Sequence, residues 1–284
     1  MKKIGYLITE EKITTEHCKN IILKAAKDKL KRQSVKRALS NLELFANDLK
    51  RLDPYAIASI PKRGIHYGYR AITKWLNRDY KGTKWCLKCD IKKCYDNIKP
   101  QYVVECFKRF MKDKKYLKLL QTVAFSMKSL PLGNYTSAWF ENLLLLKLDT
   151  TIRQSDGINY YLRYVDDFIV LSSNKRKLRR LLPTIVEILQ KVELKLKQNW
   201  QIFRTKVRGI DMLGYRFFYN YVLLRKRNLY GLYRTLKHYV KKPCKYWATR
   251  LSCRLGGLKW FSSFKLENYI NSKINYSQLR GLCK

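Results

Sequence analysis

Two runs of strand-favouring residues flank a pair of aspartates near the middle of the chain. The first run covers residues 160–164 and the second covers residues 168–171. Valine, isoleucine and aromatic residues favour strands, whereas aspartate favours turns. The pattern therefore predicts a tight hairpin with Asp166 and Asp167 at its turn. Two adjacent carboxylates repel each other unless a cation offsets their charge.

A second alternating pattern predicts a strand that ends near Asp90. One face carries Trp85, Leu87, Cys89 and Ile91, and the opposite face carries Lys84, Cys86, Lys88 and Asp90. We expect Asp90 to emerge on an open face, where it can meet the aspartate pair across a sheet. Cys86 and Cys89 lie three positions apart, which in a strand points them to opposite faces and makes them poor joint ligands of zinc.

Apolar residues recur at helical spacing over much of the remaining chain. Basic helices are predicted over residues 14–52 and 101–127, a leucine-rich core helix over residues 142–148, and further basic helices from about residue 223, with a break at Pro243. Residues 209–219 predict a second hairpin.

Two glycine-containing loops separate these elements. We expect residues 60–70 to form a basic loop in which Lys62, Arg63 and Arg70 can grip phosphates. The second loop, over residues 129–140, is marked by proline and glycine and precedes the leucine-rich helix, for which Asn134, Thr136 and Ser137 are possible caps.

The charge balance points to a polyanionic partner. The chain has 61 Lys and Arg against 21 Asp and Glu, a formal net charge of +40. Repulsion of this size opposes compaction, and the 21 tyrosines and 6 tryptophans supply rings that can stack on bases. Nucleic acid is therefore the leading partner, and an anionic membrane is the weaker alternative.

Hydropathy and cysteine usage favour a cytosolic protein without a membrane partner. No apolar run approaches the ~20 residues of a membrane-spanning helix, and the N-terminus lacks the apolar stretch of a secretory leader. The eight cysteines are expected to be small buried hydrophobes of a reducing compartment.

The order of elements predicts an α+β fold with an antiparallel sheet backed by helices, on whose open face three carboxylates meet. Three carboxylates can hold two Mg²⁺ ions ~3.5–4 Å apart, which activate an attacking hydroxyl and stabilise the leaving oxygen. In a strongly basic chain, such a centre is typical of phosphoryl transfer on nucleic acid. The competing interpretation is a solvated Asp-Asp turn in an ordinary hairpin.

Four motifs resemble those of reverse transcriptases and occur in that family's order. Tyr164-Val165-Asp166-Asp167 resembles the family signature, and Asp90 followed five positions later by Tyr95 resembles the first catalytic motif. Leu130-Pro131-Leu132-Gly133 resembles the nucleotide-site loop, and Met212-Leu213-Gly214-Tyr215 resembles the primer-grip hairpin.

The resemblance covers roughly residues 55–259 and implies an RNA-directed DNA polymerase with a right-hand architecture that makes cDNA from an RNA template. It divides the chain into N-terminal helices with short fingers over residues 1–84, a palm over residues 85–220 and a helical thumb over residues 221–284. The implied cofactor is a pair of Mg²⁺ ions, which Mn²⁺ can replace.

The resemblance also implies roles for individual residues. The catalytic residues are Asp90, Asp166 and Asp167, and the metal ligands are Asp90, Ile91, Asp166 and Asp167. The nucleotide-binding residues are Tyr95, Leu132, Gly133, Lys62, Arg63 and Arg70, and the primer grip comprises Leu213, Gly214 and Tyr215. Tyr95 is the implied steric gate that excludes a ribose 2′-hydroxyl.

Within the family, the chain is most similar to reverse transcriptases of diversity-generating retroelements, phage and bacterial systems that copy a template RNA with errors at adenines. Residues 81–88, 132–137 and 255–259 carry this likeness. Leu132 stands where accurate relatives usually place glutamine, and its aliphatic side chain cannot hydrogen-bond to template or nucleotide. The implied partners are template RNA, the RNA/DNA hybrid, deoxynucleoside triphosphates and a small basic accessory protein.

Three departures from the subgroup are visible. Ala138 stands where glutamine is common, and Trp200 stands where many relatives have a lysine proposed to protonate pyrophosphate, for which Lys195 and Lys197 are nearby substitutes. The segment before Asp90 is shorter than the usual fingers. Two alternative functions therefore stay open: a retron-like or phage-defence reverse transcriptase, and a catalytically weak RNA-binding scaffold.

Overall fold

The computed structural model describes residues 53–60, 62–110, 117, 121, 124–125 and 135–283. The helices predicted over residues 14–52, the later part of the helix predicted over residues 101–127, and the loop with Leu132 and Gly133 lie outside these residues.

Four antiparallel strands form the main sheet in the order β2-β3-β1-β4. The strands are β1 (Trp85–Asp90), β2 (Tyr160–Tyr164), β3 (Asp167–Ser172) and β4 (Gln201–Arg204). Strands β2 and β3 form the predicted hairpin, in which Tyr164 lies opposite Asp167 and only two residues make the turn. Strand β1 pairs with both β3 and β4, so the predicted strand ending at Asp90 is confirmed at the centre of the sheet.

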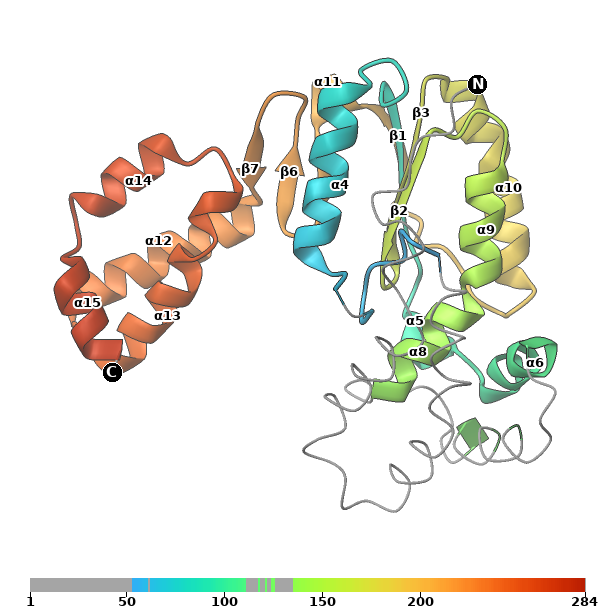
Figure 1. Cartoon of the computed structure of the whole chain (residues 1–284), viewed down its shortest axis with the longest axis horizontal. Helices are drawn as coiled ribbons and strands as arrows, with labels where there is room; N and C mark the ends of the chain where they lie inside the picture. Colours follow the sequence, from blue (N-terminus) through green and yellow to red (C-terminus); the bar gives the residue numbers. More distant parts are fainter. Residues whose placement is uncertain are drawn as a thin grey trace.

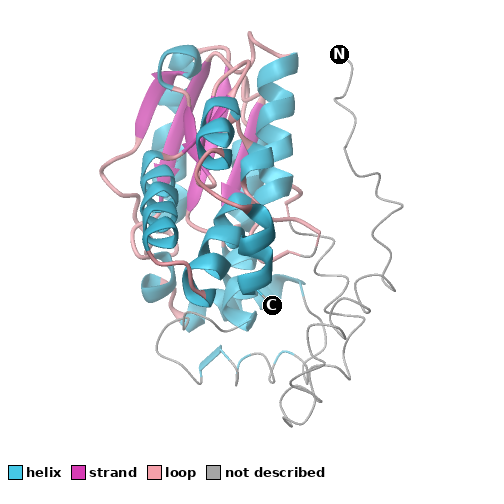
Figure 2. Ribbon diagram, turned by 90° about the vertical axis from the view of Figure 1, so that its left-hand side faces the viewer, coloured by secondary structure: helices cyan, strands magenta, loops and turns pink. Residues whose placement is uncertain are grey.

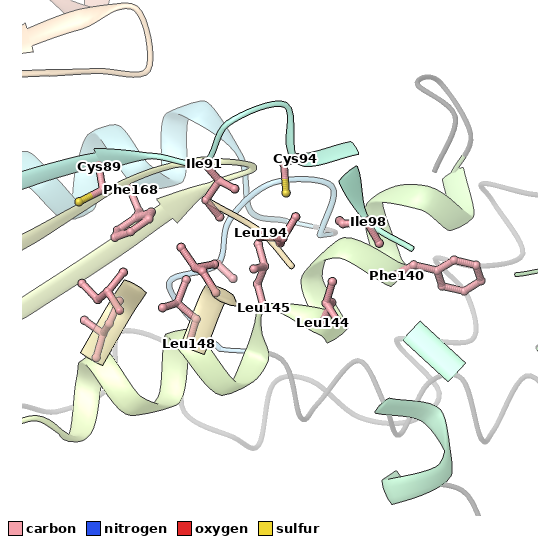
Figure 3. Close-up of a cluster of buried hydrophobic side chains, with 14 of the residues drawn as sticks. Cys89, Ile91, Cys94, Ile98, Phe140, Leu144, Leu145, Leu148, Phe168 and Leu194 are labelled. Carbon is pink, nitrogen blue, oxygen red and sulfur yellow. The ribbon is translucent and has the colours of Figure 1, made fainter. Parts of the chain in front are cut away.

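Helices cover both faces of this sheet (Figures 1 and 2). On one face lie α5 (Cys94–Asn97), α6 (Pro100–Phe110), α8 (Tyr135–Leu144), α9 (Leu146–Gln154) and α10 (Lys175–Gln190). Their core includes Phe168 and Ile91 from the sheet and Leu145 and Leu148 from the helical layer (Figure 3). All four side chains are at most 1% exposed, and each such burial contributes roughly 1.5–3 kcal/mol.

The opposite face packs on α4 (Ile65–Arg78) and on a second antiparallel sheet made of β5 (Ile210–Met212), β6 (Tyr215–Phe217) and β7 (Val222–Leu224). The β5–β6 turn consists of Leu213 and Gly214, with φ angles of 56° and 86°, which confirms the predicted second hairpin. Gly68 of α4 lies against this turn: a Cβ at this position would be 2.6 Å from Leu213 Cδ1, so only glycine fits without a shift.

The C-terminal helices form a separate group beside β7 (Figure 1), and their buried side chains form a core of their own. They are α12 (Lys226–Lys241), α13 (Lys245–Leu255), α14 (Phe264–Asn271) and α15 (Tyr276–Cys283), while the short α11 (Thr205–Arg208) follows β4. Pro243 separates α12 from α13, as predicted. The 3₁₀ turn Leu258–Trp260 returns to α4, where the Trp260 ring stacks on His66 with centroids 4.2 Å apart. No helix in the described part of the chain is long and apolar enough to cross a membrane.

Three sequence predictions need correction. The loop predicted over residues 129–140 is wrong from Tyr135 onward, because α8 begins there. The basic loop predicted over residues 60–70 is wrong beyond Gly64, because α4 begins at Ile65 and buries Gly68, Ala71 and Ile72 at helical spacing. The face of β1 that carries Asp90 is not open throughout, because Cys86 on that face is fully buried. The α+β fold with its antiparallel sheet and helices is confirmed. The boundaries at residues 84/85 and 220/221 stay predictions, and β7 pairs with β6 across the second one.

Candidate active site

Asp90 is the last residue of β1 and lies directly opposite Asp167, the first residue of β3. Facing residues of an antiparallel pair have Cα atoms ~4.5–5.5 Å apart and side chains on one sheet face. Asp166 precedes Asp167 in the hairpin turn, and its carbonyl accepts a hydrogen bond from the Ile91 amide at 3.0 Å. The structure therefore brings the three aspartates and Ile91 together. The Ile91 side chain is a hydrocarbon without a ligand atom, so only its carbonyl could bind a metal.

The hairpin turn contains a strained residue. Val165 has a φ of 59°, a conformation that β-branched residues rarely adopt and that costs roughly 1–3 kcal/mol. Two contacts hold the turn in place. The Val165 carbonyl accepts a hydrogen bond from Arg163 Nη1 at 3.1 Å, and the Asp166 carbonyl accepts one from the Ile91 amide at 3.0 Å.

Arg163 is itself anchored by a buried ion pair. Its Nε and Nη2 atoms donate to the two carboxylate oxygens of Asp149 at 2.8 and 2.7 Å. Both side chains are at most 1% exposed, and Tyr161 donates a further hydrogen bond of 2.5 Å to Asp149. Because Asp149 is on α9 and Arg163 is on β2, this pair ties the helical layer to the hairpin that carries Asp166.

Two lysines face the carboxylates of Asp90 and Asp167. Lys197 Nζ lies 2.6 Å from Asp90 Oδ1, and the Lys197 amide donates to the Asp90 carbonyl at 2.8 Å. Lys88 Nζ lies 3.5 Å from Asp167 Oδ2 and also donates to the carbonyl of Asp211 in β5. These ammonium groups partly offset the negative charge, and Lys88 links the main sheet to the second sheet.

Burial and mutual repulsion raise the pKa of two of the carboxyl groups. Burial is the main cause for Asp167, and the neighbouring Asp90 adds to it, so that the pKa of Asp167 rises to about 6 although Lys88 opposes the shift. Burial likewise raises the pKa of Asp166, with a further contribution from Asp90. The site therefore disfavours its own negative charge, which a divalent cation would stabilise.

The donor set fits a hard divalent cation. Asp167 Oδ1 is buried and has no hydrogen-bond partner among the described residues, which leaves this oxygen available as a ligand. Carboxylate and carbonyl oxygens are the ligands that Mg²⁺ prefers. In the described ranges no three Asp, Glu, His or Cys side chains are already gathered in a metal-binding geometry; the cations in contact with Asp90 and Asp167 are Lys197 and Lys88.

Tyr95, the predicted steric gate, follows the strand end in α5 and lies near Glu141 of α8. Glu141 is 1% exposed, and burial raises the pKa of its carboxyl group despite the nearby Arg163 guanidinium. Burial also raises the pKa of the Tyr95 hydroxyl, and the Glu141 charge raises it further. Tyr95 is therefore a neutral phenol next to a buried acid of the helical layer.

The predicted phosphate-gripping residues lie around the start of α4. Lys62 is exposed and has a φ of 60°, and Arg70 is exposed on the helix. Arg63 is partly buried and donates to the Asp53 carbonyl at 2.7 Å, so it holds the preceding loop. Their roles in nucleotide binding stay predictions, as do those of Leu132 and Gly133, which lie outside the described residues.

Lys88 links the predicted primer-grip hairpin to the carboxylates, because its ammonium contacts both Asp167 and the carbonyl of Asp211 in β5. Leu213 and Gly214 form its turn, and the Gly214 carbonyl accepts from the Arg225 amide at 3.0 Å. The Tyr215 ring is buried against Tyr69, with centroids 5.4 Å apart. Tyr215 therefore packs in the core, and its contribution to primer binding stays a prediction.

Sequence reasoning missed Arg163, Asp149, Lys88 and Glu141 as residues of this site. Arg163 had a visible signal, because a charged residue inside an otherwise apolar strand needs a buried partner. Asp149 at the end of a leucine-rich segment was the matching acid. Glu141 had no comparable signal, since its burial depends on how α8 packs against α5.

Comparison with known proteins places this chain in a family. A family model described as "Reverse transcriptase (RNA-dependent DNA polymerase)" matches residues 18–217. Among curated proteins no match was found.

Solved telomerase structures resemble the fold. Telomerase from Candida tropicalis in complex with a TWJ fragment of telomeric RNA has a TM-score of 0.50 and 15% identity, covering 81% of this chain and 46% of that one. Apo telomerase from the same organism has a TM-score of 0.48 and 14% identity, covering 80% and 44%. The chain thus spans less than half the length of these telomerase chains, and at this identity the first similarity concerns the fold alone.

Proposed function

Because the chain belongs to the reverse transcriptase family of RNA-dependent DNA polymerases, we propose that Asp90, Asp166 and Asp167 hold two Mg²⁺ ions and use them to extend a DNA primer on an RNA template. The observation that carries the proposal is the direct cross-strand pairing of Asp90 with Asp167, next to the turn that presents Asp166. Like charges facing each other across a sheet are destabilising. Because the fold keeps these like charges together, we infer that a bound cation offsets their repulsion.

Each aspartate would have a distinct part in the metal site. Asp167 would offer the buried unpartnered Oδ1, Asp90 the carboxylate that pairs with Lys197, and Asp166 the carboxylate of a turn whose carbonyl binds the Ile91 amide. Bound ions would lower the pKa of the primer 3′-hydroxyl and would stabilise the departing pyrophosphate. The Ile91 carbonyl would complete the ligand set.

Tyr95 would select the sugar. Its ring follows the strand end that carries Asp90 by five residues and lies near Glu141. An aromatic ring at this position would leave no room for a ribose 2′-hydroxyl, so deoxynucleotides would be preferred. Lys62, Arg63 and Arg70 would attract the triphosphate, and the Leu213–Tyr215 hairpin would support the primer end.

The finer part of the proposal is a mutagenic role in a diversity-generating retroelement. Its support is the aliphatic Leu132 and the motifs over residues 81–88 and 255–259. A side chain without hydrogen-bonding groups cannot make a contact that favours the correct nucleotide over a mismatched one, so the discrimination opposite adenine would be lower. A small basic accessory protein and a structured template RNA would be the partners.

The test is primer extension on an RNA template with Mg²⁺ and deoxynucleotides, with and without added cell extract, followed by sequencing of the product. We expect extension, with errors concentrated opposite template adenines and reduced by Leu132→Gln. Uniform errors would contradict the mutagenic role and favour a retron-like enzyme. Absence of extension under both conditions would contradict polymerase activity itself and favour the RNA-binding scaffold.

A further inference from the structure

A basic cavity lies at the end of the main sheet remote from the aspartates. Its volume is about 480 Å³, and its cations are Lys81, Lys84, Lys175, Arg176 and Arg179, grouped beside the Trp85 ring. Trp85 begins β1 and Asp90 ends it, so the cavity is ~17 Å from the catalytic carboxylates at ~3.3 Å per strand residue.

The cations come from two separate segments that the sheet brings together. Lys81 and Lys84 lie in the loop before β1, and the other three lie in the first turns of α10. The pairing of Trp85 with Ser172 sets these segments side by side. Asn174 caps α10 by accepting a hydrogen bond from the Arg176 amide at 2.8 Å, and the helix dipole adds positive potential at this end.

Within the described ranges, no carboxylate balances the positive charge of this cavity. None of the five cations forms an ion pair with a carboxylate in the described part of the chain, and no acid lines the cavity. Two acids of neighbouring segments are engaged elsewhere: Asp79 accepts hydrogen bonds from the Gly82 amide and the Tyr160 hydroxyl, and Asp156 pairs with Lys177.

The chemistry of the lining favours phosphate groups over bases. The Lys175 ammonium lies 5.1 Å and the Arg204 guanidinium 5.3 Å from the centroid of the Trp85 ring. The ring is therefore already engaged by cations, so an incoming ligand meets charge and not a bare stacking surface. Five cations spread over one open cavity exceed what a single phosphate group needs, which suits the repeated phosphates of a polynucleotide.

We propose that this cavity binds the phosphate backbone of RNA, without sequence preference, as a second contact remote from the polymerase centre. The choice of RNA as the polyanion rests on the proposed function, whereas the anionic character of the ligand rests on the cavity alone. Such a contact would hold the template while the primer end is extended at the aspartates.

The test compares two triple variants of the full chain in fluorescence anisotropy with a labelled single-stranded RNA. The cavity variant is Lys84→Gln/Arg176→Gln/Arg179→Gln. The control variant, Lys108→Gln/Lys147→Gln/Arg180→Gln, removes the same charge from exposed helix positions outside the cavity. We expect the cavity variant to lose at least about tenfold in RNA affinity at 0.1 M salt. The slope of log affinity against log salt concentration should fall by ~2, because each lost phosphate contact with a single strand contributes ~0.7 to it.

Equal losses in the two variants would overturn the proposal, because they would reflect the overall charge of the chain. Loss of binding to a free deoxynucleoside triphosphate, with RNA binding unchanged, would also overturn it. Asp166→Asn serves as the independent reference: it should abolish extension and leave RNA affinity unchanged. If Asp166→Asn still extends primers, the proposed function fails while the cavity result stands by itself.

Discussion

Arg163 connects a buried acid to the turn that carries Asp166. Its guanidinium binds both carboxylate oxygens of Asp149 at 2.7 and 2.8 Å and donates to the carbonyl of Val165 at 3.1 Å. The strained Val165 conformation is thus supported by a cation that cannot move without leaving a charge buried and unpaired. The turn that presents Asp166 is therefore tied to an ion pair buried in the core.

Breaking this pair should destabilise the protein strongly. Asp149→Asn leaves the Arg163 charge buried without its counter-ion, and such a loss costs about 3–5 kcal/mol of unfolding free energy. Urea denaturation measures the effect. The matched control is Asp156→Asn, which breaks a pair with a 92% exposed acid and should leave the denaturation midpoint unchanged. Equal midpoints for wild type and Asp149→Asn would contradict this role.

Asp167 should oppose folding at neutral pH when no metal is bound. Burial raises its pKa from 3.8 to about 6, so the folded state disfavours the ionised carboxylate relative to the unfolded chain. The penalty is absent below pH 3.8 and grows to at most roughly 3 kcal/mol above the folded-state value, at ~1.36 kcal/mol per pKa unit.

Asp167→Asn in EDTA should therefore be more stable than wild type at pH 8, and the advantage should vanish near pH 4. Urea denaturation at both pH values checks this. Asp156→Asn is again the control, because Lys177 lowers the pKa of Asp156 and its neutralisation gives no such gain. A wild type that is more stable than Asp167→Asn at pH 8 would refute the prediction.

Lys197 should compete with a metal ion for Asp90. Its ammonium is 2.6 Å from Asp90 Oδ1 and is 40% exposed, so the pair weakens metal binding by up to about fivefold. Lys197→Gln should lower the Mg²⁺ concentration that gives half-maximal primer extension by this factor. The exposed Lys195→Gln should not change it. A higher Mg²⁺ requirement for Lys197→Gln would show that the lysine assists the metal site.

The bulk of Tyr95 should decide between deoxyribose and ribose. Tyr95→Ala removes the ring and should reduce the preference for dCTP over CTP, measured as the ratio of kcat/KM values, by roughly 10–200-fold. Tyr95→Phe keeps the ring, loses only the hydroxyl and should retain most of the preference. Unchanged selectivity in Tyr95→Ala would remove Tyr95 from the role of gate.

Local patterns were sufficient to predict the elements that carry the aspartates. The alternation before Asp90 and the β-favouring flanks of Asp166 and Asp167 are short-range signals, and the structure contains both strands and the tight turn. The same holds for the hairpin at Leu213 and Gly214. Their facing register depends on pairing between distant segments, which strand patterns suggest but do not specify.

The contacts that support the site could not be read from the sequence. Gly64 and Gly68 suggested a loop, yet Gly68 is a helix residue that lets α4 approach Leu213. Burial of the β1 face at Cys86 follows from the packing of α4 and the second sheet. The Arg163–Asp149 pair and the Tyr95–Glu141 contact each join two elements through tertiary packing, so no local pattern encodes them.

The most direct measurement is single-turnover primer extension on an RNA template across a Mg²⁺ titration, comparing wild type with Asp166→Asn and with Asp156→Asn. If the aspartates hold the catalytic metals, wild type and Asp156→Asn should extend the primer in a Mg²⁺-dependent manner, and Asp166→Asn should be slower by at least about 10³-fold. Extension by Asp166→Asn at the wild-type rate would contradict a metal-dependent polymerase centre at this turn.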